Sequence, residues 1–187
     1  MLNLFRVRGF TAFVAAVFLN AFVDLGHKIV IQNTVFKIYA GDLQVTLTAI
    51  VNALILLPFV LLFTPAGFVA DRYSKPVVMR RAAWAAVALT LMITLFYYLG
   101  WFWPAFVMTF LLGAQAAFYS PAKFGYIREL VGAAELTTAN GVVQAVSTLA
   151  MLAGIFVFSV LFEHCLANLL PTSSNEVLVH IAPSAGA

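Results

Sequence analysis

The sequence predicts an all-α membrane protein, and three observations lead to this prediction. The chain contains five long apolar stretches, 64% of its 187 residues are hydrophobic, and only 9% are charged. Soluble domains have about 45–50% apolar and about 25% charged residues, so this chain lacks the polar surface that a soluble fold presents to water. A segment that crosses lipid must satisfy its own backbone hydrogen bonds, which favours helices and excludes an open sheet.

The lengths of the apolar stretches fit membrane spans, which need about 20 mostly apolar residues. We predict spans at residues 10–35, 45–63, 77–99, 104–119 and 139–161. The first stretch follows Arg6 and Arg8 and therefore resembles the apolar core of a signal peptide. Four further spans follow it, which favours a retained helix over a cleaved leader.

The spans define the expected domain organisation. We predict a helical bundle over residues 1–163, followed by an outer loop and the stub of a sixth helix over residues 164–187. Pro183 interrupts the short apolar run of this stub. Because the sequence stops where a sixth helix would begin, we expect a truncated product.

The distribution of positive charge predicts the orientation. If the N-terminus lies in the cytoplasm, only Lys37 lies outside, Lys28 lies within the first span, and the other basic residues lie inside: Arg6, Arg8, Arg72, Lys75, Arg80, Arg81, Lys123 and Arg128. This is the positive-inside distribution of multi-pass membrane proteins. The aromatic residues near the predicted outer turn, at positions 97–103, agree with it because such rings prefer the headgroup boundary.

Several function classes receive no support from the sequence. The basic residues are spread over short clusters between apolar stretches, so no nucleic-acid patch is expected. The only cysteine is Cys165, and His27, His164 and His180 are too scattered for a metal site. We find no pairing of a nucleophile with a base and no phosphate-binding glycine loop, and we therefore expect neither catalysis nor a cofactor.

The first span carries an unusual polar face. Asn20, Asp24 and Lys28 are spaced i, i+4, i+8 and share one side of a helix, with His27 at its edge. Ionisable groups are costly in a bilayer and commonly mark functional sites. Two interpretations remain open: a binding site, or a structural ion pair between Asp24 and Lys28 that holds span one against span five.

The fourth span offers weaker candidates. Gln115 and Tyr119 either line a cavity or form hydrogen bonds within the bundle. Lys123 and Arg128 are expected in an inner loop, where they can meet anionic headgroups, although the topology alone accounts for them.

The segment after the second span carries a motif. Gly67 lacks a side chain, so another helix can approach there, and Asp71 can accept hydrogen bonds or pair with a basic group. Together with Arg72 and Lys75, these residues resemble the signature loop of the major facilitator superfamily, which places a glycine four residues before an aspartate and a basic run after it. The resemblance implies a latch that forms in one conformation and breaks in another. The sequence departs from the signature at Ser74, where a second glycine is usual, and at Pro76, where a basic residue is usual.

A second stretch narrows the resemblance. The run from Ser120 through Pro121, Ala122 and Lys123 to Gly125, followed by Ala139-Asn140-Gly141, is similar to the lysophospholipid transporter branch of that superfamily. The polar first span is similar to that branch as well, except that His27-Lys28 replaces the commoner aromatic–basic pair. The likeness is strongest to the transporter module that some Gram-negative bacteria fuse to an acyltransferase and acyl-carrier-protein synthetase.

This resemblance implies a major facilitator fold of twelve helices in two halves, of which this chain would hold nearly the first. It implies a carrier of lysophosphatidylethanolamine and related lysophospholipids, which moves them inward across the bacterial inner membrane for reacylation. For such a zwitterionic cargo, Lys28 would bind the phosphate and Asp24 the ammonium group, with Asn20, His27 and Gln115 nearby. The implied partners are the lipid bilayer, a missing C-terminal half, and a fused or adjacent acyltransferase.

Two other functions are open at this stage. The chain could belong to a major facilitator exporter of drugs or small metabolites, and binding of single-chain lipids would distinguish the two. It could also be a non-transporting anchor for an acyltransferase, although an anchor has no use for Asp24 inside a span.

Overall fold

The protein is an all-α membrane protein whose computed structural model describes residues 4–167 and 171–185. A short 3-10 helix, η1 (Leu4–Arg6), precedes six α-helices in these ranges, which contain no strand. The helices are α1 (Phe10–Ile38), α2 (Gly41–Arg72), α3 (Lys75–Leu99), α4 (Phe102–Val131), α5 (Leu136–Leu166) and α6 (Ser174–Ala185). The first five are long and apolar enough to cross a membrane, as the sequence predicts.

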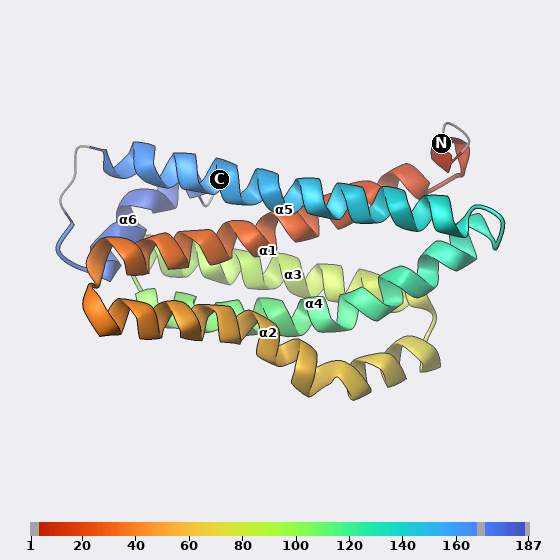
Figure 1. Cartoon of the computed structure of the whole chain (residues 1–187), viewed down its shortest axis with the longest axis horizontal. Helices are drawn as coiled ribbons and strands as arrows, with labels where there is room; N and C mark the ends of the chain where they lie inside the picture. Colours follow the sequence, from red (N-terminus) through yellow and green to blue (C-terminus); the bar gives the residue numbers. More distant parts are fainter. Residues whose placement is uncertain (1–3, 168–170, 186–187) are drawn as a thin grey trace.

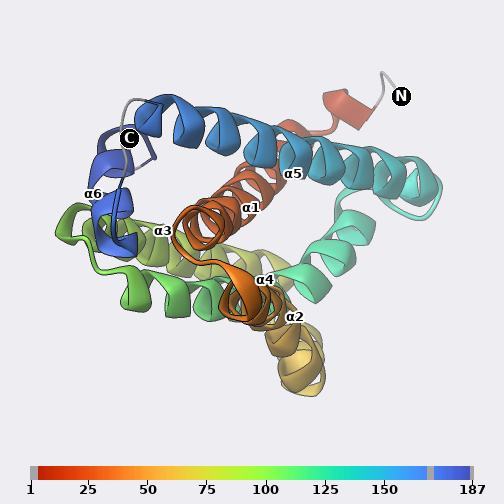
Figure 2. The same cartoon turned by 60° about the vertical axis from the view of Figure 1, so that its left-hand side comes forward.

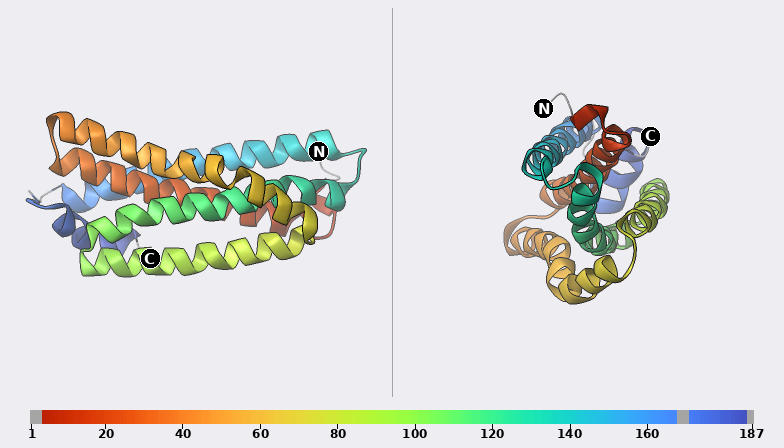
Figure 3. Two further views of the ribbon diagram at one scale, coloured as in Figure 1. Left: turned by 90° about the horizontal axis from the view of Figure 1, so that it is seen from below. Right: turned by 90° about the vertical axis from the view of Figure 1, so that its right-hand side faces the viewer.

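The five long helices lie along the long axis of the molecule, and α6 packs at one end (Figures 1 and 2). The most extensive contacts join α1 to α5, α2 to α4, and α3 to α4. The connections α1–α2 and α3–α4 share one end of the bundle with α6, which we call the aromatic end because Trp101, Phe102 and Trp103 lie there (Figure 3). The opposite end holds the start of α1 and Arg72, and we call it the basic end.

Glycines allow the two main helix pairs to pack closely. A Cβ on Gly154 of α5 would lie 2.6 Å from the carbonyl oxygen of Phe22 in α1, and a Cβ on Gly26 would lie 2.5 Å from the ring of Phe158. On the other pair, a Cβ on Gly113 of α4 would lie 3.0 Å from the carbonyl oxygen of Ile55. Small residues permit close approach of membrane helices.

Two helices extend well beyond their predicted spans. We expected the second span to end near residue 63, but α2 continues to Arg72, so Gly67 and Asp71 are helical. We expected the fourth span to end near residue 119, but α4 continues to Val131, so Lys123 and Arg128 belong to a helix and not to a loop. Hydropathy marks only the apolar part of a helix. Pro65 and Pro121 each remove one backbone donor from the extensions, but both helices continue past them.

Prolines inside the helices shape the basic end. Pro58 and Pro65 lie within α2, and Pro121 lies within α4. Figure 1 shows the second half of α2 turning away from its first half, while the end of α4 turns towards α5. Proline removes a backbone donor and its ring displaces the preceding turn, which accounts for such bends. The two helices therefore separate towards the basic end.

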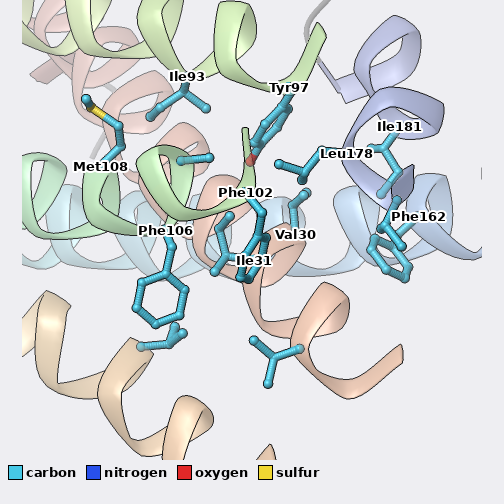
Figure 4. Packing of buried hydrophobic residues seen from close by; sticks show 14 of the residues in the cluster. Val30, Ile31, Ile93, Tyr97, Phe102, Phe106, Met108, Phe162, Leu178 and Ile181 are labelled. Carbon is cyan, nitrogen blue, oxygen red and sulfur yellow. The ribbon is translucent and has the colours of Figure 1, made fainter. Parts of the chain in front are cut away.

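Two hydrophobic clusters hold the bundle. The cluster at the aromatic end joins all six α-helices, with Val30, Tyr97, Phe102, Phe162 and Leu178 buried in it (Figure 4). The cluster at the basic end includes Leu4, Phe10 and Ile127. Between them lies the polar part of α1.

The region after residue 163 differs from the expected loop. Helix α5 continues to Leu166, and α6 includes Pro183, which we expected to end the apolar run. Residues 168–170 of the predicted outer loop and residues 186–187 of the predicted stub lie outside the described residues. The side-chain oxygen of Asn175 in α6 accepts a hydrogen bond from the backbone N–H of Phe102 at 3.3 Å, so α6 also caps the start of α4.

Candidate functional site

A cavity of about 240 Å³ lies in the bundle between α1, α2, α4 and α5. Its walls are mainly apolar, with contributions from Leu25, Phe59, Leu112 and Met151. Its polar lining comes from a small set of side chains: Asn20, Asp24, Thr109, Tyr119, Ser120, Lys123 and Ser147. An apolar chamber with a few convergent polar groups is the usual form of a small-molecule site.

Asp24 and Asn20 reach the cavity from one face of α1, as their spacing predicts. The Nδ2 of Asn20 donates to Oδ2 of Asp24 at 2.9 Å. The Nε2 of Gln115 in α4 donates to Oδ1 of Asn20 at 3.1 Å. A hydrogen-bonded chain therefore runs from Gln115 through Asn20 to the carboxylate and fixes its position between α1 and α4.

Lys123 is the cation of this cavity. It lies one helical turn beyond Tyr119 on α4, and both side chains line the cavity that Asp24 lines. Its Nζ lies 4.8 Å from the centroid of the Phe124 ring. The sequence interpretation assigned Lys123 to a loop, and the signal that could have revealed it is the i, i+4, i+8 spacing of Gln115, Tyr119 and Lys123, which repeats that of Asn20, Asp24 and Lys28.

Tyr119 contributes an unsatisfied polar group. Its hydroxyl oxygen is buried and has no hydrogen-bond partner within the described part of the chain. Buried polar atoms are nearly always paired, so an unpaired hydroxyl in a cavity wall is available to a bound molecule. Together with Asp24 and Lys123, it provides an anion, a cation and a neutral hydrogen-bonding group on one surface.

Lys28 does not line the cavity. It is partly buried on α1, and no carboxylate oxygen of the described residues lies within 4 Å of its Nζ. The structural ion pair with Asp24, which the sequence left open, is therefore not formed in this structure. The assignment of Lys28 to substrate binding stays a prediction. The cation that lines the cavity with Asp24 is Lys123.

His27 lies outside the cavity, in a buried cluster that joins three helices. Its Nε2 is 3.1 Å from the carbonyl oxygen of Ala105 in α4, and its Nδ1 is 2.6 Å from the hydroxyl of Tyr97 in α3. A carbonyl only accepts, so Nε2 carries the proton and Nδ1 accepts from the tyrosine O–H. Thr109, whose Oγ1 is 3.3 Å from Nε2, also lines the cavity. His27 thus holds α1 against α3 and α4, one turn from Asp24.

A groove of about 630 Å³ runs between the second half of α2 and α4. Phe59 and Ser120 line both this groove and the central cavity, so the two spaces adjoin. Gly67 and Asp71, predicted as gating residues, lie along the groove. No atom lies within 4 Å of the position that a Cβ on Gly67 would take, so the close helix approach predicted there is absent from the described bundle.

The other predicted gating residues lie at the basic end. The Nζ of Lys75, at the start of α3, is 3.6 Å from Oε1 of Glu129 near the end of α4. The aliphatic part of Lys75 passes over Gly125, where a Cβ would approach its side chain to 3.2 Å. Arg72 is exposed at the end of α2. An ion pair thus joins Lys75 of the motif to α4. Gating by Gly67, Asp71, Arg72 and Lys75 stays a prediction.

Together these features define a multi-pass helical membrane protein whose internal cavity is lined by one acidic residue, Asp24, and one basic residue, Lys123. The chain is similar to two curated relatives, both named lysophospholipid transporter LplT. It is 31% identical over 147 residues to the protein of Photorhabdus laumondii and 30% identical over 151 residues to that of Serratia proteamaculans. Each alignment covers 79% of this chain and 35% of the relative, so the chain spans about a third of their length. No protein-family model and no solved structure matches the chain.

Proposed function

We propose that this chain forms part of a lysophospholipid transporter and that the central cavity holds the lipid head group. The observation that carries the proposal is the placement of Asp24 and Lys123 in one apolar chamber of a chain similar to lysophospholipid transporters. No ion pair within 4 Å joins these two side chains, so both charges are available to a ligand.

A lysophosphatidylethanolamine head group has the matching charges. Its phosphate would meet Lys123 and its ammonium group would meet Asp24, with the Tyr119 hydroxyl between apolar walls. Charge-assisted hydrogen bonds of this kind are stronger than neutral ones. The cavity, at about 240 Å³, is smaller than the roughly 300–1,000 Å³ typical of sites that enclose a whole drug-sized ligand. It therefore suits a head group, and the acyl chain would lie in the adjoining groove beside Phe63, Phe68 and Phe124.

The proposal extends to the membrane in which the chain lies, its orientation and its partners. The clustering of Arg and Lys at the basic end supports a bacterial inner-membrane protein with its N-terminus in the cytoplasm. Further helices, corresponding to the C-terminal half implied by the major facilitator resemblance, would close the cavity on its remaining side. Inward movement of lysolipid to this end would deliver it to an acyltransferase, fused or separate, for reacylation.

A liposome assay tests the proposal directly. The purified chain is reconstituted into liposomes with lysophosphatidylethanolamine that carries a fluorescent nitrobenzoxadiazole group on its acyl chain, and dithionite reports the fraction of lipid moved to the inner leaflet. We expect Asp24→Asn and Lys123→Gln to slow movement roughly tenfold, because each removes one charge-assisted contact. Lys37→Gln is the matched control, since Lys37 is an exposed cation in the last turn of α1.

Binding is measured in parallel by the fluorescence of the same label, because both charged residues of the cavity belong to this chain. Equal binding by the parent chain, Asp24→Asn and Lys123→Gln would remove the cavity from the proposal. Loss of binding in both variants, with Lys37→Gln unchanged, supports it even if the chain alone moves no lipid.

A further inference from the structure

A second pocket, of about 380 Å³, lies between α2, α3 and α4 towards the basic end. Most of its wall is apolar, with Val69, Val78, Ala82 and Phe118 among the lining residues. Arg81 is the only charged residue in that lining, and Gln115 supplies its buried polar group. Neither Asp24 nor Lys123 lines it, so this pocket is distinct from the central cavity.

The hydrogen-bond network determines which atom of Gln115 is left without a partner. The carboxylate of Asp24 accepts from Asn20 Nδ2, which leaves the Asn20 Oδ1 to accept from Gln115 Nε2. The amide of Gln115 therefore directs its nitrogen to Asn20, and its Oε1 is left without a partner. Gln115 is only 6% exposed, so this oxygen is a buried, unsatisfied acceptor. An amide oxygen cannot donate, and only a ligand with a hydrogen-bond donor satisfies it.

The pocket thus combines a buried acceptor, a cation and an apolar wall. A lysophospholipid carries the three matching groups: a free glycerol hydroxyl that donates, a phosphate close to it, and one acyl chain. A diacyl phospholipid has an ester in place of the hydroxyl and has no donor at that position. Leaving a buried acceptor unpaired carries a penalty, so this oxygen discriminates between the two lipids.

We propose that the pocket between α2, α3 and α4 is a second lysophospholipid site, in which Gln115 Oε1 accepts a hydrogen bond from the free glycerol hydroxyl and Arg81 binds the phosphate. The inference rests on the proposed function for the class of lipid, and it adds a separate site that selects lysolipid over diacyl lipid. Because the pocket lies towards the basic end, it would hold lysolipid in the leaflet on that side of the membrane.

Photo-crosslinking tests this site separately from transport. Tyr73 lines the pocket and is 49% exposed, so p-benzoylphenylalanine in its place keeps an aromatic ring at the rim. The same amino acid in place of Trp84, a lipid-exposed aromatic residue on α3 that does not line the pocket, is the matched control. The probe is lysophosphatidylethanolamine with a terminal alkyne on its acyl chain, added to the chain in lipid nanodiscs.

Three unlabelled lipids that compete with the probe show which kind of lipid occupies the pocket. They are lysophosphatidylethanolamine, its 2-O-methyl ether, which keeps the single chain but lacks the hydroxyl donor, and diacyl phosphatidylethanolamine. We expect saturable crosslinking at position 73 and none at position 84. Lysolipid should compete at concentrations on the order of tenfold lower than its methyl ether or the diacyl lipid, which corresponds to one buried hydrogen bond.

Substitutions of Arg81 and Gln115 test the two proposed contacts, with the phosphate and with the glycerol hydroxyl. Arg81→Gln should reduce the saturable crosslinking at least fivefold, whereas Arg80→Gln should leave it unchanged, because Arg80 is an exposed neighbour outside the pocket lining. Gln115→Leu should abolish the difference between lysolipid and its methyl ether. Equal competition by these two lipids in the parent chain, or equal losses in Arg80→Gln and Arg81→Gln, would overturn the proposal.

The outcome is separable from that of the proposed function. Lysolipid binding that depends on Asp24 and Lys123, without saturable crosslinking at position 73, would reject the second site and leave the central cavity intact. Selective crosslinking at position 73, with binding unaffected by Asp24→Asn and Lys123→Gln, would do the reverse.

Discussion

Lys75 at the start of α3 lies 3.6 Å from Glu129 near the end of α4, and this is the one ion pair within 4 Å in residues 4–167 and 171–185. The pair connects the motif after α2 to the helix that carries Tyr119 and Lys123. A conformational change that separates α3 from α4 at the basic end must therefore break it.

On the proposed function, this pair should affect lysolipid transport more than stability. Both side chains are partly or largely exposed, and exposed ion pairs contribute about 0.2–1 kcal/mol. Lys75→Gln and Glu129→Gln should therefore shift the melting temperature by only a few degrees while changing the lysolipid transport rate by up to roughly fivefold. The charge-swapped double variant, Lys75→Glu with Glu129→Lys, should return the rate towards the parent value. Additive effects of the two swaps would show that the pair has no such role.

The close contact between α1 and α5 predicts a sensitive position. A methyl group at residue 154 would lie 2.6 Å from the carbonyl oxygen of Phe22, which is backbone and cannot rotate away. Gly154→Ala should lower the free energy of unfolding by about 1–3 kcal/mol, as overpacking does, measured by thermal denaturation in detergent. Gly141→Ala, on the same helix but with no atom within 4 Å, should be neutral or slightly stabilising. Equal effects of the two substitutions would contradict the packing described here.

The His27 cluster predicts a non-additive pair of substitutions. His27→Leu leaves the buried hydroxyl of Tyr97 without its acceptor, which should cost about 1–3 kcal/mol in unfolding free energy. Adding Tyr97→Phe removes that unsatisfied hydroxyl, so the double variant should be more stable than His27→Leu alone. The measurement is a double-mutant cycle of thermal stability, and strict additivity would rule out the Tyr97 O–H to His27 Nδ1 bond.

The start of α6 predicts a local dependence on pH. The Glu176 carboxylate accepts from the backbone N–H and the hydroxyl of Thr172, and the backbone hydrogen bond is the main reason that its pKa lies below the ordinary value. A lowered pKa stabilises the folded turn above the ordinary glutamate pKa, and this contribution disappears as the pH falls through the lowered value. Hydrogen exchange of α6, after correction for intrinsic rates, should therefore be faster at about pH 3 than at about pH 6. Glu176→Gln should reduce this difference, and an unchanged difference would mean that another group controls it.

The sequence predicted the five spans from the length and apolar composition of its stretches, and the shared face of Asn20 and Asp24 from their i, i+4 spacing. The positions of Asp24 and Asn20 in the cavity follow from i, i+4 spacing, and Gln115 joins them through one hydrogen bond. These features are properties of single helices, which a hydrophobic pattern determines well.

Hydropathy did not reveal the cation of the cavity, although its i, i+4, i+8 spacing from Tyr119 and Gln115 is a signal that could have done so. Lys28 shares a helix face with Asp24, yet it does not line the cavity, because the lining depends on where α2, α4 and α5 pack against α1. Lys123 lies beyond the apolar part of the fourth span, where hydropathy gives no information about whether the helix continues. The lack of a partner for Gln115 Oε1 could not be predicted either, because it follows from the hydrogen bond between Asn20 and Asp24.

The packing of Gly154 against Phe22 and of Gly26 against Phe158 also bears on biosynthesis. Helix α1 leaves the ribosome before its principal partner α5, so α1 cannot reach its final surroundings until α5 has been inserted. Until then its aspartate lacks the finished chamber, because Ser147 and Met151 of the chamber wall belong to α5. During that interval, the insertion machinery or nearby water must keep the aspartate of this segment away from lipid. A nascent chain arrested before α5 should therefore be the form that membrane proteases recognise first.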